Sequence, residues 1–173
     1  MHIAYTIAPA KGDTDLALFT LADTLIEDGL RLAGTVQINT ERECEGPCDM
    51  DVKVLPDGPI VRISQSLGRH AKGCRLDPEA LEDTVGHVSR TLSSQVNLLI
   101  INKFGKHEAM GRGFRDVIAD AIARDIPVLV GLNGLNKEAF LSFVAGEATA
   151  LAPDLDALRD WVHGVSRATP QAA

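Results

Sequence analysis

The sequence is poor in aromatic residues, in cysteines and in long apolar segments. Aromatic side chains make up 4% of the 173 residues, and there are 3 cysteines. The core must therefore be packed mainly with Leu, Ile, Val and Ala, as in ordinary α/β proteins, and the composition suits neither a fibre nor a disordered chain. No apolar run approaches the roughly 20 residues that cross a bilayer, so we expect no membrane insertion.

Basic residues are also outnumbered, with 17 Lys and Arg against 24 Asp and Glu and a formal net charge of -7. This charge repels nucleic acid and anionic membranes, although a local group of cations can still bind a small anion. Residues Met1 to Tyr5 lack the charged region and the cleavage site of a secretory signal. We therefore expect no nucleic-acid partner, a cytoplasmic location, and free thiols at the cysteines.

The length fits one α/β domain, residues 1–165, followed by a flexible tail at residues 166–173. Strand and helix patterns alternate, which predicts a three-layer fold with a mostly parallel sheet. The predicted strands are Ile3 to Ala8, Leu32 to Ile38, Leu98 to Ile101, Ile126 to Val130 and Ala148 to Leu151. The predicted helices begin near Asp13, Asp77, Phe114, Asn136 and Asp154, and the last of them is expected to end at Val162.

Residues 39–73 interrupt this alternation. Asp51 to Leu55 and Ile60 to Ser64 are short strand-like segments, and they flank the turn sequence Pro56-Asp57-Gly58. We predict a β-hairpin inserted into the α/β framework.

Polar and cationic residues crowd the loop that follows Leu98 to Ile101. The continuous apolar run is typical of a strand buried on both faces, and ligands in such sheets collect beyond the carboxyl ends of the strands. The candidate anion-binding residues in this loop are Asn102, Lys103, Lys106 and Arg112. Glu108 could act as a base or a magnesium contact, but an ion pair with Lys106 or Arg112 is favoured because a general base needs a geometry that the sequence does not show.

A second cationic loop runs from Gly68 to Arg75 and contributes Arg69, Lys72 and Arg75. Glycine-freed backbone amides beside Arg or Lys can form an anion cradle, whereas an exposed basic loop can also be merely solvated. Two cationic loops in an acidic protein favour the anion interpretation.

The three cysteines allow three interpretations. Cys44 and Cys48 are separated by three residues, and with Cys74 they could bind a soft metal if the hairpin folds back. They could also sense redox state, but free cysteines are more commonly small buried groups, and that interpretation is favoured.

The first strand-to-helix turn, Ala8 to Asp15, lies where a nucleotide-binding protein of this build has its phosphate loop. It has one glycine, and Lys11 precedes Gly12 instead of following it. Aspartates at the start of the helix also disfavour phosphate. We therefore expect Asp13 or Thr14 to cap the helix and do not expect nucleotide hydrolysis.

The segments Ile101 to Gly113, Gly34 to Gln37, Cys48 to Met50 and Cys74 to Asp77 resemble a bacterial domain family of unassigned function. Its members are similar to nucleoside-triphosphatase-like P-loop proteins and tend to be encoded near molybdenum-transport genes. The resemblance covers nearly the whole chain and implies a P-loop-like sheet and a link with molybdenum metabolism.

These observations together predict a small-oxyanion binding protein, with molybdate as the ligand that the resemblance implies. Lys103, Lys106 and Arg112 would supply charge, Asn102 would supply hydrogen bonds, and the second cationic loop would form a lid. Two alternatives remain: an NTPase-like enzyme with a degenerate phosphate loop, and an interaction module that binds a protein partner in a metal-cofactor pathway.

Overall fold

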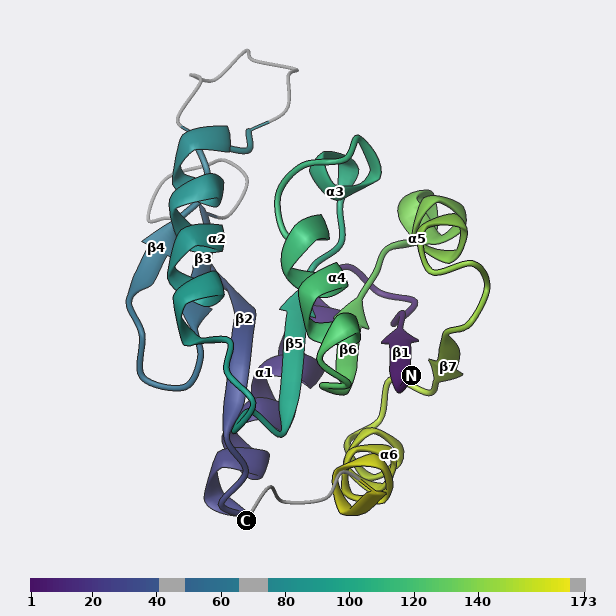
Figure 1. Cartoon of the computed structure of the whole chain (residues 1–173). Coiled ribbons are helices and arrows are strands. Elements are labelled where there is room, and N and C mark those ends of the chain that lie inside the picture. Colours follow the sequence, from purple (N-terminus) through teal and green to yellow (C-terminus); the bar gives the residue numbers. More distant parts are fainter. Residues whose placement is uncertain (41–48, 66–74, 169–173) are drawn as a thin grey trace.

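The strands form one seven-stranded sheet in the order β4-β3-β2-β5-β6-β1-β7. The computed structural model describes residues 1–40, 49–65 and 75–168 (Figure 1). The strands are β1 (Ile3–Thr6), β2 (Leu32–Thr40), β3 (Asp49–Val54), β4 (Ile60–Arg62), β5 (Leu98–Asn102), β6 (Val128–Gly131) and β7 (Thr149–Leu151). The five adjacent strands β2, β5, β6, β1 and β7 are parallel to one another. The predicted α/β fold with a mostly parallel sheet is confirmed.

Helices cover both faces of the sheet, which gives three layers (Figure 1). The helices α1 (Asp13–Glu27) and α6 (Leu155–Ala168) pack on one face, where Leu18, Leu21 and Leu158 share an apolar cluster with Ile100. The helices α2 (Pro78–Thr91), α4 (Arg115–Ala123) and α5 (Lys137–Phe143) pack on the other. Two short helical segments, α3 (Lys106–Ala109) and η1 (Gly134–Asn136), follow β5 and β6. No helix in these ranges is long and apolar enough to span a bilayer.

The central strand β5 is buried along its whole length. Leu98 and Ile100 lie in the cluster beneath α1 and α6, whereas Leu99 and Ile101 lie in the opposite cluster. The continuous apolar run thus reflects a strand covered on both faces, as its sequence predicted. Its carboxyl end places the polar loop at one edge of the sheet.

The inserted hairpin extends the sheet at the free side of β2. Strand β3 is antiparallel to β2 and to β4, and the turn at residues 55–59 closes with a hydrogen bond from the Gly58 N–H to the Val54 carbonyl, 2.9 Å. This confirms the predicted hairpin, although β4 is only three residues long. Strand β2 runs two residues further than predicted because its end pairs with β3.

The start of helix α1 differs from the prediction. Neither predicted cap is used: the N-cap is Gly12, in the left-handed region at φ 91°, and no side chain caps the helix. The Thr14 hydroxyl instead accepts a hydrogen bond from the Ala8 N–H at 2.8 Å, because the preceding loop folds back over the first turn. At the other end Gly29, at φ 83°, follows the last turn, in the left-handed conformation that glycine adopts after a helix.

Other parts of the predicted secondary structure also needed correction. Strand β1 ends at Thr6, so the loop before α1 begins earlier than predicted. Within the polar loop, α3 is a helical turn that the loop prediction missed. Helix α6 continues to Ala168, so the predicted end at Val162 is wrong and residues 166–168 are helical. Residues 169–173 lie outside the described part of the chain.

Candidate functional site

A buried carboxylate, that of Asp15, organises the carboxyl edge of the sheet. Asp15 lies in the first turn of α1, which crosses the ends of β5 and β2. It is 4% exposed, and its partners Gln37 and Asn102 are 5% and 1% exposed. A buried carboxylate is stable only when its oxygens are hydrogen-bonded, so its partners define the structure of this edge.

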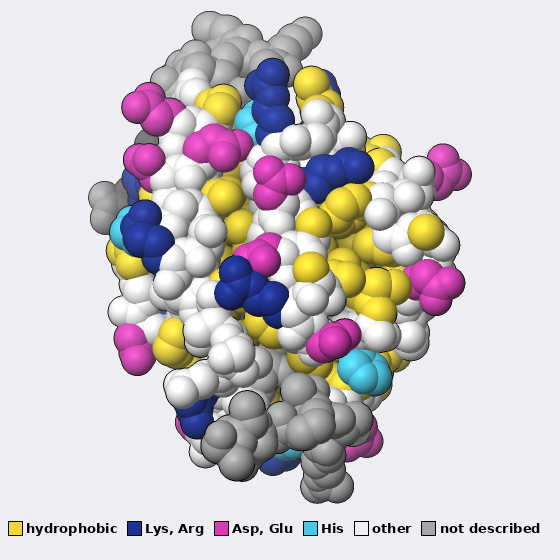
Figure 2. All heavy atoms as spheres, in the orientation of Figure 1, with side chains coloured by type: hydrophobic (Ala, Val, Ile, Leu, Met, Phe, Trp, Pro, Cys, Tyr) yellow, Lys and Arg dark blue, Asp and Glu magenta, His cyan; other side chains and the backbone are white. Residues whose placement is uncertain are grey.

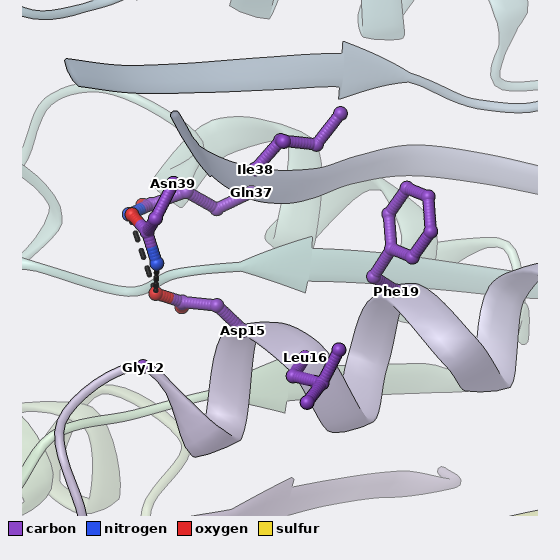
Figure 3. A pocket seen from close by; sticks show the side chains of 7 residues that line it. All are labelled: Gly12, Asp15, Leu16, Phe19, Gln37, Ile38 and Asn39. Carbon is purple, nitrogen blue, oxygen red and sulfur yellow. Dashed lines mark hydrogen bonds between the residues drawn. The ribbon is translucent and has the colours of Figure 1, made fainter. Parts of the chain in front are cut away.

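Three carboxamides from two strands donate to Asp15. The Nδ2 of Asn39 lies 2.8 Å from Oδ2, and the Nε2 of Gln37 lies 3.3 Å from the same oxygen (Figure 3). The Nδ2 of Asn102 donates to Oδ1 at 3.1 Å. Gln37 also donates to the Oδ1 of Asn39 at 2.8 Å. The ends of β2 and β5 are thus tied to the start of α1 by one polar network.

Lys103 supplies the positive charge of this network. Its Nζ lies 3.4 Å from the Asp15 Oδ1, and the Lys103 side chain is 34% exposed whereas that of Asp15 is 6% exposed. Three neutral amides also donate to Asp15, so the carboxylate does not depend on this long contact. An ammonium group has three N–H donors, and those that are not directed at Asp15 can donate to a ligand on the solvent side.

Asn102, which was expected to donate hydrogen bonds to an anion, is part of the network around Asp15. One N–H of its amide is donated to Asp15, and its Oδ1 is buried without a hydrogen-bond partner among the described residues. A Cβ on Gly131, opposite it in β6, would lie 2.6 Å from that oxygen. Because Gly131 has no Cβ, there is room beside it for the Asn102 side chain, which donates a hydrogen bond to Asp15.

The expected ion pair of Glu108 is wrong. Its carboxylate is buried and accepts hydrogen bonds from the N–H of Gly105 at 2.8 Å and from the N–H of Phe114 at 3.2 Å. Burial raises the pKa of the Glu108 carboxyl above its ordinary value, while the two backbone hydrogen bonds act to lower it. Glu108 therefore closes the loop around α3 and does not face Lys106 or Arg112.

Replacing Glu108 with alanine is expected to lower the free energy of unfolding by about 1–3 kcal/mol, because the buried Phe114 N–H loses its acceptor. The raised pKa means that the folded state favours the protonated carboxyl. Its stabilising contribution is complete below the ordinary pKa of about 4.3 and declines as the pH rises through the raised value. Urea unfolding of wild type and variant across this pH range measures the difference. Asp116→Ala, at an exposed position of α4, is the control, and a difference that grows with pH would contradict the assignment.

The other predicted cations that the structure describes, Lys106, Arg112 and Arg75, lie on other segments than the network around Asp15. Lys106 begins α3 and Arg112 follows it, and both are exposed. Figure 2 shows Lys and Arg side chains at the end of the molecule that carries α3. The Nη2 of Arg75 lies 3.4 Å from Oδ1 of Asp49 on β3, so this guanidinium is part of an ion pair with the hairpin.

Five predicted site residues, Arg69, Lys72, Cys44, Cys48 and Cys74, lie outside the described residues. Within residues 1–40, 49–65 and 75–168, no group of three or more His, Cys, Asp or Glu side chains is placed to hold a metal ion. The metal interpretation of the cysteines stays a prediction.

The sequence analysis missed three residues of the network: Asp15, Gln37 and Asn39. Two signals could have indicated them. Gln37 and Asn39 are polar residues at the carboxyl end of a strand, where ligand sites form in such sheets. Asp15 is a charged residue in the first turn of α1, on the buried face that continues with the apolar residues Leu18 and Leu21.

The loop between β1 and α1 has the place of a phosphate loop but different chemistry. The motif Gly-x-x-x-x-Gly-Lys-Ser/Thr can be aligned on Gly12 and Thr14. Ile7 then takes the position of the first glycine, and Asp13 takes that of the lysine. The Thr14 hydroxyl accepts the Ala8 N–H, so the loop is folded onto its own helix.

Comparisons with known proteins show the family of the chain and a relative of part of its length. The sequence model of a family described as "Protein of unknown function (DUF2478)" matches residues 3–161. The Molybdenum import ATP-binding protein ModC 2 of Bradyrhizobium diazoefficiens is 35% identical over 165 residues, which make up 95% of this chain and 18% of that protein. The chain thus spans only 18% of the length of this relative.

Two solved structures share the fold over 99% of this chain and 100% of their own. The solution structure of a human cancer-related nucleoside triphosphatase has a TM-score of 0.71, and the crystal structure of THEP1 from the hyperthermophile Aquifex aeolicus has one of 0.66. Both are 15% identical in sequence, so the likeness establishes the P-loop type of fold alone.

Proposed function

The chain belongs to the DUF2478 family of proteins of unknown function, and we propose that it is a small-oxyanion binding domain linked to molybdenum import. Molybdate, a tetrahedral oxyanion, is the leading ligand. The link to molybdenum is supported by the 35% identity to a part of a molybdenum import ATP-binding protein. The location of the site is argued from the charges at the carboxyl edge of the sheet.

The observation that carries the proposal is the position of Lys103. Its ammonium is held beside the carboxyl edge of the sheet by a 3.4 Å contact with Asp15, which three amides also satisfy. An ammonium that is positioned by one neighbour and exposed to solvent on another side can donate to an oxyanion without first being ordered. A lone surface lysine has no such neighbour to hold its ammonium group in position.

The charges next to Lys103 favour an anion. Lys106 and Arg112 are exposed cations on the same loop. Glu108, the carboxylate between them in sequence, is buried and turned toward backbone N–H groups. The loop itself therefore exposes cations and no carboxylate of its own, and one carboxylate from outside it, that of Glu82 on α2, accepts the Gly113 N–H at 3.1 Å. In this proposal Lys103, Lys106 and Arg112 contact the anion, and Asn102 positions Asp15 and Lys103.

Only two of the three cations of the second cationic loop are part of the proposed anion site. Arg69 and Lys72 are proposed to close over the anion, and both lie outside the described residues. Arg75 is instead assigned to the ion pair with Asp49. Equilibrium dialysis of wild type and Lys72→Ala against molybdate, followed by elemental analysis, tests this contribution. A weaker retention by the variant supports the lid, and equal retention removes it from the proposal.

A nucleotide-binding role is the second candidate. It is favoured by the place of the loop between β1 and α1 and by the left-handed Gly12 at its end. Binding of a nucleotide would not require hydrolysis, and the two are separated by the next experiment.

We expect no magnesium-dependent hydrolysis of ATP or GTP. The loop has Asp13 where a phosphate loop has its lysine, and the Thr14 hydroxyl is engaged by the Ala8 N–H. Release of phosphate is measured with and without magnesium, beside an active P-loop hydrolase as the positive control. Steady turnover that is abolished by Lys11→Ala would overturn this expectation, and binding without turnover would support the second candidate.

A further inference from the structure

A cavity of about 360 Å³ lies between the first two turns of α1 and the carboxyl end of β2. Figure 3 shows the side chains of α1 and of β2 on its two sides. Its lining residues are Gly12, Asp15, Leu16, Phe19, Gln37, Ile38 and Asn39. The volume is that of a small-molecule site. The loop after β5, which carries the proposed anion contacts, contributes no residue to this lining, and the two sites meet at Asp15, whose Oδ1 lies 3.4 Å from the Lys103 Nζ.

One wall of the cavity is apolar and incompletely covered. Leu16 is 66% exposed, and Phe19 and Ile38 are half-buried. The Leu16 and Phe19 side chains form this apolar wall, whereas the Ile38 side chain points to the other side of β2, because successive residues of a strand face opposite sides of the sheet (Figure 3). A flat apolar group placed against the Phe19 ring would remove this surface from water, which is favourable.

The polar edge of the cavity has one unused acceptor and one unused donor. The Gln37 Nε2 donates to Asp15 and to Asn39, which uses both of its N–H groups. The Gln37 Oε1 accepts no hydrogen bond from any described residue. The Asn39 Nδ2 donates to Asp15 and keeps one further N–H. A 2.8 Å hydrogen bond from the Gln37 Nε2 to the Asn39 Oδ1 ties the two amides together at this edge.

The charge of the cavity favours an uncharged ligand. Asp15 is already balanced by Lys103 and by three amide donors, so a cation gains little there. An anion inside the cavity would lie beside the carboxylate of Asp15, which disfavours it.

We propose that this cavity binds an uncharged planar heterocycle that presents a hydrogen-bond donor and an acceptor on one edge, as an amide or a lactam does. The donor of the ligand meets the Gln37 Oε1, its acceptor meets the Asn39 Nδ2, and its ring lies against Phe19. This site goes beyond the proposed oxyanion function, because it uses other residues and another ligand chemistry.

The test is a titration of ¹⁵N-labelled full-length protein with nicotinamide and uracil, followed by NMR chemical shifts. Both probes have an amide-type edge on a flat ring. We expect saturable shifts at residues around the cavity, with a dissociation constant on the order of 1 mM, as suits a fragment of this size. Benzoate, which has the ring and a negative charge, is expected to bind at least about tenfold more weakly.

Two variants separate the site from general effects. Asn39→Ala, at an exposed position, removes the donor and is expected to weaken both probes roughly two- to tenfold. Leu16→Trp is expected to fill the cavity and to abolish the shifts. Leu135→Trp is the matched control, because Leu135 is also an exposed leucine, at 93%, but lies after β6.

Binding that is lost in Leu16→Trp and kept in Leu135→Trp supports the site. No saturable shift in wild type, benzoate binding as tight as nicotinamide, or probe binding unchanged in folded Leu16→Trp would overturn it. A parallel molybdate titration of Leu16→Trp keeps the two proposals distinct, since anion binding is expected to survive when the cavity is filled.

Discussion

Replacing Asp15 with alanine is expected to lower the free energy of unfolding by about 2–4 kcal/mol, a large share of the stability of an ordinary domain. The carboxylate accepts the amides of Gln37 and Asn102, both buried, and they lose their acceptor in the variant. Each unsatisfied buried donor is destabilising by about 1–3 kcal/mol. Lys103 and Asn39 are more exposed and can be hydrated, so they add less.

Urea unfolding at neutral pH measures this effect, and Asp13→Ala is the matched control. Asp13 lies two residues earlier in the same turn of α1 and is exposed, so its removal is expected to change the stability by less than about 0.5 kcal/mol. Equal effects of the two variants would show that the network around Asp15 does not organise this edge.

The second large effect is expected on anion binding. Lys103→Ala should weaken binding of molybdate about tenfold, because a charge-assisted hydrogen bond contributes about 1.5–3 kcal/mol. Lys103→Ala combined with Arg112→Ala should weaken it on the order of 100-fold if the two contacts are independent. Folding should survive, since Asp15 keeps its three amide donors.

Two matched variants test whether the effect is local. Lys53 on β3 also forms a contact with an aspartate, 4.0 Å from Asp23 on α1. Arg31 precedes β2 and is therefore at the opposite edge of the sheet from Arg112. Lys53→Ala and Arg31→Ala remove the same charges as the test variants, so a similar loss of affinity in these controls would indicate a nonspecific effect of net charge.

Much of the fold could be predicted because local pattern and tertiary packing agree. The run Leu98 to Ile101 is apolar without alternation, and both faces of β5 are covered. Asp77 before Pro78 predicts a helix start, and the Asp77 side chain accepts the N–H groups of Glu79 and Ala80. The boundaries that failed depend on longer-range contacts, such as the fold-back of the loop before α1.

The candidate site could be predicted only in its location. The loop after β5 was identified because parallel strands end at one edge, and Lys103 lies there. Its partner Asp15 is 88 residues away in the sequence, and no local pattern joins them. Glu108 was misassigned for a related reason: its sequence neighbours are cations, but burial turns the carboxylate toward backbone N–H groups.

The central claim, that the loop after β5 binds a small oxyanion, is tested most directly by calorimetric titration of molybdate into the wild type and into the Lys103→Ala, Arg112→Ala double variant, with tungstate, sulfate and phosphate in parallel. We expect saturable binding of molybdate to the wild type and its loss in a double variant that thermal unfolding shows to be folded. No binding of any of the four anions to the wild type, or equal binding by the folded double variant, would contradict it.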